Sequence, residues 1–128
     1  MSKKDSGIKG EEMAVKFLKK NGYKIITRNF RSYDGEIDII ALKEKYLSFV
    51  EVKLRNNQEF GDIKYSIDKK KRERIIKTAL YFITENKKYS KFDIRFDAVF
   101  LERNDNEDYK ISLMKNIFFI DNNIKGFY

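Results

Sequence analysis

The chain lacks cysteine, histidine, proline and tryptophan, and it has only six glycines in 128 residues. Without cysteine and histidine there is no disulfide, no thiolate or imidazole catalysis, and no zinc site of the usual kind. Any catalyst must therefore use carboxylates, lysine, hydroxyl groups or a hard cation held by oxygen ligands. The scarcity of proline and glycine leaves no flexible linker, and 41% hydrophobic residues are enough for a core. We expect one domain over residues 1–128.

Long apolar runs are also missing from the sequence. No stretch approaches the roughly 20 apolar residues that a membrane helix needs, and the N-terminus has no apolar signal segment. We therefore expect a cytoplasmic protein without a membrane partner. The 28 Lys and Arg residues exceed the 20 Asp and Glu residues and give a net charge of +8. This excess favours nucleic acid as a partner, and a lysine-rich surface that only aids solubility is the alternative.

The hydrophobic pattern changes between helical and strand periods along the chain. The order of these segments, with a helix followed by strands, a second helix and further strands, predicts an α/β sandwich with a mixed sheet. The helical period covers residues 8–21 and 68–86, and the strand period covers residues 23–30, 36–42, 46–54, 92–101 and 109–114.

Three charged residues lie inside two of the apolar strand segments. Asp38 is in one segment, and Glu51 and Lys53 are in the next. Burying charge is costly without a partner such as a metal ion, and a hairpin would bring the three together. Two carboxylates with a lysine suit metal-dependent hydrolysis of a phosphodiester. The alternative is an ordinary Glu51–Lys53 ion pair on a solvated strand face, with Asp38 unrelated to it.

Two further carboxylates bear on this hypothesis. Glu11 shares a helical face with Ala14 and Leu18, so it points towards the core. A core-facing carboxylate from a separate helix favours a site over an isolated ion pair. Glu36 has the same strand parity as Asp38, so it could supplement or replace Asp38 as a metal ligand.

Several short motifs extend over nearly the whole chain. The motifs are Gly7-x-x-Gly10-Glu11-x-x-Ala14, Gly22-Tyr23, Arg28-Asn29-Phe30-Arg31, Gly35-Glu36-Ile37-Asp38, Phe49-Val50-Glu51-Val52-Lys53 with Arg55, Gly61, Lys71 and Arg95-Phe96-Asp97. With them the chain resembles the YraN family of small bacterial proteins, which look like Holliday-junction resolvases and the wider PD-(D/E)xK nuclease superfamily. The superfamily's Pro-Asp signature is Ile37-Asp38 here.

The resemblance implies a fold, a chemistry and a partner. The fold is a restriction-endonuclease-like three-layer sandwich with a central mixed β-sheet flanked by helices. The implied metal ligands for Mg²⁺ or Mn²⁺ are Asp38, Glu51 and Glu11, which with Lys53 form the catalytic set. The implied substrate is DNA rather than RNA, and the likeness to resolvases extends this to branched or structured DNA cut by a homodimer. The alternative is a nucleic-acid-binding or DNA-processing accessory module that keeps the nuclease fold without turnover.

Basic residues near these positions are candidates for contacts with DNA phosphates. Lys71 is at the head of the inner stripe of the second helix, and Lys70 and Arg74 are near it. Lys70 and Arg74 are explained equally well as part of a solvated helix face. Arg28, Arg31 and Arg55 are explained nearly as well by salt bridges to nearby acidic residues. The six candidates are Lys71, Arg55, Arg31, Arg28, Lys70 and Arg74.

Two aromatic residues lie in expected loops near the site. There Tyr33 and Phe60 could stack on unpaired bases, whereas most other aromatics fall on apolar faces and belong to the core. Arg95 and Asp97 share a strand face, where they can pair with each other.

Overall fold

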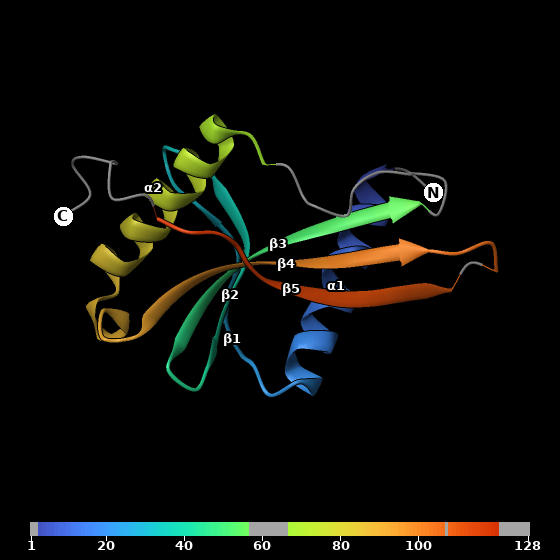
Figure 1. The fold of residues 1–128 in the computed structure, drawn as a ribbon, viewed down its shortest axis with the longest axis horizontal. Coiled ribbons are helices and arrows are strands. Elements are labelled where there is room, and N and C mark those ends of the chain that lie inside the picture. Colours follow the sequence, from blue (N-terminus) through green and yellow to red (C-terminus); the bar gives the residue numbers. More distant parts are fainter. Residues whose placement is uncertain (1–2, 57–66, 107, 121–128) are drawn as a thin grey trace.

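The computed structural model describes residues 3–56, 67–106 and 108–120 (Figure 1). Helix α1 begins at Lys3 rather than at residue 8, and β5 ends at Phe118 rather than at residue 114, while the other expected elements are found close to their predicted bounds. The elements are α1 (Lys3–Lys20), β1 (Lys24–Arg31), β2 (Glu36–Lys43), β3 (Tyr46–Asn56), α2 (Lys69–Glu85), the 3-10 helix η1 (Lys87–Tyr89), β4 (Asp93–Arg103) and β5 (Tyr109–Phe118).

The described strands form one mixed sheet in the order β1-β2-β3-β4-β5. β1, β2 and β3 are consecutive antiparallel neighbours, and β4 and β5 are also antiparallel. β3 and β4 are parallel, and helix α2 is in the connection between them, as parallel strands require. The predicted mixed sheet is therefore confirmed.

The two helices lie on opposite faces of the twisted sheet (Figure 1). Ala14 and Leu18 of α1 pack in a core cluster with Val50 of β3. Ile75 and Phe82 of α2 pack in a separate cluster on the other face. The result is the predicted three-layer arrangement of helix, sheet and helix. Neither helix in the described stretches is long and apolar enough to cross a membrane.

Local signals in the sequence set the ends of the helices. Gly22 has a φ of 89° and its N–H reaches the Lys19 carbonyl at 3.1 Å, which is how a glycine ends a helix. Asp68 caps α2, because its Oδ1 accepts a hydrogen bond of 2.8 Å from the Lys71 backbone N–H. The end of α1 and the start of α2 therefore agree within one residue with the predicted ranges, which end the first helix at residue 21 and begin the second at residue 68.

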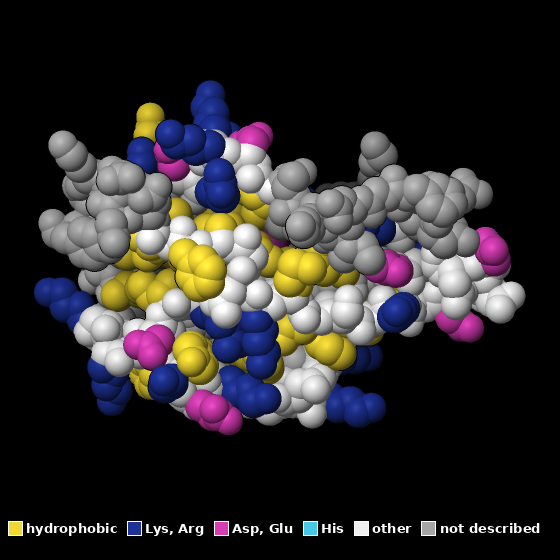
Figure 2. All heavy atoms as spheres, viewed as in Figure 1, with side chains coloured by type: hydrophobic (Ala, Val, Ile, Leu, Met, Phe, Trp, Pro, Cys, Tyr) yellow, Lys and Arg dark blue, Asp and Glu magenta, His cyan; other side chains and the backbone are white. Residues whose placement is uncertain are grey.

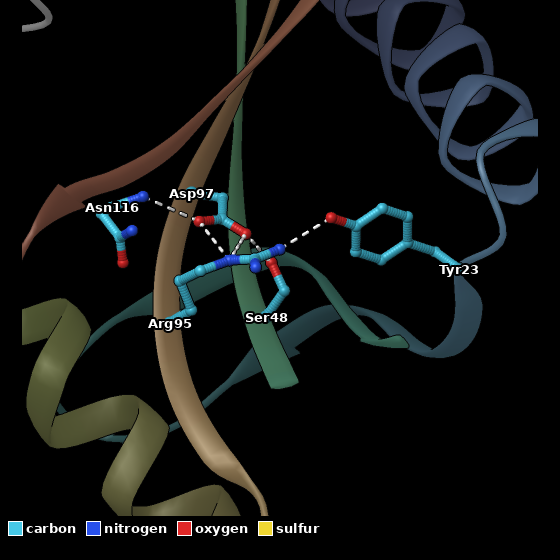
Figure 3. Close-up of polar contacts among 5 residues, drawn as sticks. All are labelled: Tyr23, Ser48, Arg95, Asp97 and Asn116. Carbon is cyan, nitrogen blue, oxygen red and sulfur yellow. Dashed lines mark hydrogen bonds and ion pairs between the residues drawn. The ribbon is translucent and has the colours of Figure 1, made fainter. Parts of the chain in front are cut away.

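A buried polar cluster ties β4 to three other parts of the fold (Figure 3). Arg95 Nε donates to both oxygens of Asp97, at 3.0 Å and 2.8 Å, so the predicted pairing of these residues is confirmed. Ser48 of β3 donates its hydroxyl to Asp97 Oδ2. The backbone N–H of Asn116 in β5 donates to Asp97 Oδ1 at 3.0 Å. The Asp97 carboxylate thus joins three neighbouring strands.

The arginine of this cluster extends the connection to the end of α1. Arg95 Nη2 donates to the hydroxyl oxygen of Tyr23 at 2.7 Å, and the guanidinium carbon lies 4.7 Å from the centre of the Tyr46 ring. Burial raises the pKa of Tyr23, so its hydroxyl stays neutral and accepts this bond. Every charge in the cluster has a partner, as buried charges require.

Candidate active site

Asp38 is held where strands β2 and β3 separate. The pairing of these strands runs from Lys43 opposite Tyr46 to Ile39 opposite Val50. Immediately beyond that pair, Asp38 Oδ2 accepts a hydrogen bond of 2.8 Å from the Val52 backbone N–H. The carboxylate takes the place of a strand carbonyl, so its position is fixed by the end of the β2–β3 ladder.

The alternation of β2 changes close to Asp38. Ile37 and Ile40 belong to the same core cluster although they are an odd number of residues apart, so they would lie on opposite faces of a regular strand. Asn29, which lies opposite Asp38 in β1, has a φ of 53°. Asparagine tolerates this left-handed conformation better than most residues. The irregularity in both strands gives the site a shape that strict alternation does not predict.

Asp38 and Glu51 line the same pocket between the sheet and the start of α2. The pocket has a volume of about 520 Å³, and Lys70, Lys71 and Arg74 of α2 line its other side. Glu51 Oε1 lies 3.4 Å from Lys71 Nζ, and the Glu51 side chain is only 14% exposed. The structure therefore brings together the two carboxylates that the hairpin argument placed side by side.

The ionisation of Asp38 reflects these surroundings. Burial raises its pKa to about 6, the negative charge of Glu51 adds to the rise, and the Val52 N–H opposes it. Weaker contributions that raise the pKa come from Glu36 and Glu11. A partly buried pair of carboxylates is electrostatically unfavourable without a cation, and such pairs are common at functional sites.

Lys53 is part of the same electrostatic group. Burial lowers its pKa, and the positive charge of Lys71 lowers it further. The charges of Glu51 and Asp38 act in the opposite direction and favour the ammonium form. Asp38, Glu51 and Lys53 therefore lie within reach of one another, with Lys71 as a second cation from α2.

Glu11 faces the sheet next to this group, but other side chains hold its carboxylate. Its Oε1 accepts hydrogen bonds from Arg28 Nε at 3.0 Å and from Asn29 Nδ2 at 2.9 Å. Within the described part of the chain, no three acidic side chains lie close enough to hold a metal ion jointly. The structure brings together Asp38 and Glu51, and the role of Glu11 as a third ligand stays a prediction. Glu36 lines the pocket, and its Oε2 lies 3.3 Å from Arg31 Nε.

The six basic candidates divide into two groups. Lys70, Lys71 and Arg74 line the pocket. The three arginines have other partners, as the salt-bridge alternative in part expects. Arg28 pairs with Glu11 and with Glu12 (2.8 Å), Arg31 pairs with Glu36, and the Arg55 guanidinium lies 5.0 Å from the centre of the Phe100 ring.

Two positions singled out in the sequence, Phe60 and Gly61, lie outside the described residues. The base-stacking role of Phe60 therefore stays a prediction. Tyr33, the other aromatic candidate, is in the turn between β1 and β2 and is exposed.

Sequence reasoning missed two features of this region. Asn29, which orients Glu11, is part of a family motif, and an asparagine within a strand segment is itself a signal for irregular backbone. Ser48 and Tyr23 are the partners of the Arg95–Asp97 pair, and neither the Gly22-Tyr23 motif nor the strand pattern around Ser48 indicates these contacts, because the residues come from distant segments that only the tertiary fold brings together.

The donor set suits a hard divalent cation. Magnesium and manganese prefer oxygen ligands, and magnesium characteristically uses one or two carboxylates together with water and substrate phosphate. Asp38 and Glu51 would supply these two carboxylates. The class defined by fold and site is thus an α/β protein with paired carboxylates and lysines at the point where two strands of a mixed sheet separate.

Comparison with known proteins places the chain in a family. Residues 10–101 match the model of the uncharacterised protein family UPF0102, also known as the YraN family, and the chain belongs to this family. It is 48% identical over 104 residues to the UPF0102 protein of Sulfurihydrogenibium sp. strain YO3AOP1, a match that covers 81% of this chain and 90% of the relative. UPF0102 proteins of Clostridium perfringens strain ATCC 13124 and Clostridium botulinum strain Hall are each 41% identical over 116 residues, which is 90% of this chain and 94% of each relative.

Proposed function

We propose that this protein is a metal-dependent endonuclease that hydrolyses DNA phosphodiesters. The observation that carries the proposal is the convergence of Asp38 and Glu51 in one pocket, where their mutual repulsion helps to raise the pKa of Asp38. A divalent cation would relieve this repulsion. The same pocket is bordered by the lysines of α2, which suit an anionic substrate.

Each residue of the site has a chemical task in this proposal. Asp38 and Glu51 would hold Mg²⁺ or Mn²⁺, which when bound supplies Lewis-acid stabilisation of phosphate charge and an acidified water. Lys53 would orient the attacking water or stabilise negative charge that develops on the phosphate. Lys71 would contact a neighbouring phosphate as a point charge.

The start of α2 supports an anionic partner independently of the carboxylates. Its first residues Lys69, Lys70, Lys71 and Arg72 are basic, although the N-terminus of a helix carries partial positive charge. A cation at this end of a helix is repelled by the helix dipole and destabilises the helix by about 0.3–1 kcal/mol at low ionic strength. In Figure 2, Lys and Arg side chains project from this end of the molecule. A bound phosphate would be attracted both by these cations and by the N-terminus of the helix, so it would relieve their mutual repulsion.

A panel of labelled nucleic acids tests the proposal. It contains a four-way junction, a flap, a gapped duplex and a blunt duplex as DNA, with an RNA duplex beside them, each incubated with Mg²⁺, with Mn²⁺ or with EDTA. We expect wild-type protein to cleave at least one DNA only when the metal is present. Lys53→Met keeps the length of the side chain and removes its charge, so it should slow cleavage by about 10²-fold without preventing DNA binding. Equal rates for the two proteins would contradict the role of Lys53.

The ion pair between Lys71 and Glu51 favours a second candidate function. Lys71 Nζ at 3.4 Å partly neutralises Glu51 in place of a metal ion, so the fold can hold its carboxylates without metal. This suits a nucleic-acid-binding or DNA-processing accessory module without turnover. Binding to structured DNA without cleavage under any metal condition of the panel would favour this second function over the first.

A further inference from the structure

A second hollow continues from the candidate active site along α2. It has a volume of about 760 Å³ and shares Gly35, Glu36, Lys70 and Arg74 with the carboxylate pocket, so the two hollows are adjacent. Sites that hold a small ligand have volumes of roughly 300–1,000 Å³, so the hollow has room for a nucleotide. Its outer part is formed by the turn between β1 and β2 and by the solvent side of α2.

The turn that borders the hollow is anchored to α2. Ser32 N–H donates to the Gly35 carbonyl at 2.9 Å, which closes the turn, and Ser32 Oγ donates to Thr78 Oγ1 of α2 at 3.1 Å. Thr78 is fully buried, and its Oγ1 would be only 3.3 Å from a Cβ at Gly35. A side chain at position 35 would therefore be a tight fit against Thr78, so the turn and the helix are in close contact here. Tyr33, in the middle of this turn, has a backbone position fixed by these contacts.

Tyr33 differs from the other aromatic residues described. Its side chain is 103% exposed, which means that it covers no apolar surface. The hollow beside it is lined by Arg31, Lys70, Arg74 and Lys77. Three carboxylates also line it, and one of them, Glu36, is already paired with Arg31. A bare aromatic ring on a fixed turn beside cations is the combination that binds an unpaired nucleotide, with the base on the ring and the phosphate on the basic side chains.

We propose that this hollow holds a nucleotide of an unpaired strand and that Tyr33 stacks on its base. The inference rests on the proposed function for one point, that the scissile phosphate lies at Asp38 and Glu51. The preferred substrate is then a nucleic acid with a single-stranded stretch next to the cleavage point, such as a flap or a gap, and not a continuous duplex. In a continuous duplex, each base is stacked between its neighbours along the strand, so no face of the base is free to stack on Tyr33.

Binding measured without cleavage tests this inference. Fluorescence anisotropy in EDTA gives the affinity for a gapped duplex and for a blunt duplex of the same length and sequence. Wild-type protein should prefer the gapped duplex. Tyr33→Ala should weaken binding to the gapped duplex by about 5- to 150-fold, the range that one base–aromatic stack provides, and leave binding to the blunt duplex unchanged. Tyr33→Phe keeps the ring and should retain the wild-type preference.

The outcomes separate this inference from the proposed function. A loss of affinity in Tyr33→Ala that is equal for the two DNAs, or no loss at all, overturns the inference, even if the protein cleaves DNA. Equal binding of the two DNAs by wild-type protein overturns it as well. A selective loss with Tyr33→Ala in a protein that cleaves no DNA supports the hollow as a single-strand site and contradicts the nuclease assignment alone.

Discussion

Asp38→Asn is expected to lower the rate of metal-dependent cleavage by on the order of 10³-fold or more. The same substitution is expected to stabilise the metal-free fold. The first effect follows because an amide is a poor ligand for Mg²⁺ and leaves the phosphate charge without its cation. The second follows because an amide removes a carboxylate that is unfavourable in its ionised form. The amide oxygen of the variant can still accept the hydrogen bond that Asp38 accepts from the Val52 N–H.

The raised pKa of Asp38 makes the stability of the metal-free fold depend on pH. The pKa of Asp38 is about 6 in the folded chain against an ordinary value of 3.8, so the folded state binds the proton more tightly than the unfolded state. The contribution of Asp38 to stability is therefore greatest below pH of about 4 and is lost as the pH rises to about 6. The loss is roughly 3 kcal/mol, which follows from the difference between the two pKa values.

Urea denaturation in EDTA at pH 4 and at pH 8 measures this difference. We expect the wild type and Asp38→Asn to have similar free energies of unfolding at pH 4, and the variant to be more stable by up to about 3 kcal/mol at pH 8. Asp93→Asn, at an exposed position at the start of β4, makes the same chemical change outside the site and should not show the divergence. A constant difference between wild type and Asp38→Asn at both pH values would contradict the account of Asp38.

Asp97→Ala should destabilise the fold by about 3–5 kcal/mol, the cost of leaving a buried charge without its partner. Arg95 is 7% exposed and Asp97 is 0% exposed, so bulk water does not solvate the guanidinium once the carboxylate is lost. The hydroxyl of Ser48 and the N–H of Asn116 would also lose their acceptor. Chemical denaturation of the variant beside wild type measures the loss.

An exposed ion pair at the start of the same strand gives the matched control. Lys45 Nζ lies 3.8 Å from Asp93 Oδ2, and the side chains are 70% and 63% exposed. Asp93→Ala should therefore change the free energy of unfolding by less than about 1 kcal/mol. If Asp97→Ala cost no more than Asp93→Ala, the buried cluster would not stabilise the fold as we describe.

The layers of the fold and the centre of the site can be predicted because they depend on local patterns. Helical and strand periods identify the elements, and the short connection between β2 and β3 brings Asp38 and Glu51 together. The helical period places Lys71 at the head of the buried stripe of α2, and its contact with Glu51 agrees with that position. Asp38 and Glu51 are close in the sequence, and the position of Lys71 follows from the period of its own helix.

The remaining features depend on long-range pairing and on backbone irregularity, which periodicity does not encode. The parallel register of β3 and β4 places Ser48 opposite Arg95, and no spacing within either segment predicts it. The left-handed conformation of Asn29 accompanies its side-chain hydrogen bond to Glu11. The resemblance to the family implies Glu11 as a metal ligand, and this stays a prediction. The structure shows the Glu11 carboxylate bound to Arg28 and Asn29, contacts that the helical period of Glu11 does not indicate.

We propose that Asp38 and Glu51 together hold one divalent cation. Electron paramagnetic resonance of Mn²⁺, titrated into wild type, Asp38→Asn and Glu51→Gln, tests it without requiring a substrate of known structure. We expect one Mn²⁺ site in the wild type and at least about tenfold weaker binding in each variant, because each loses one of two charged ligands. Unchanged Mn²⁺ binding in both variants, or no binding by wild-type protein even with DNA present, would contradict the account.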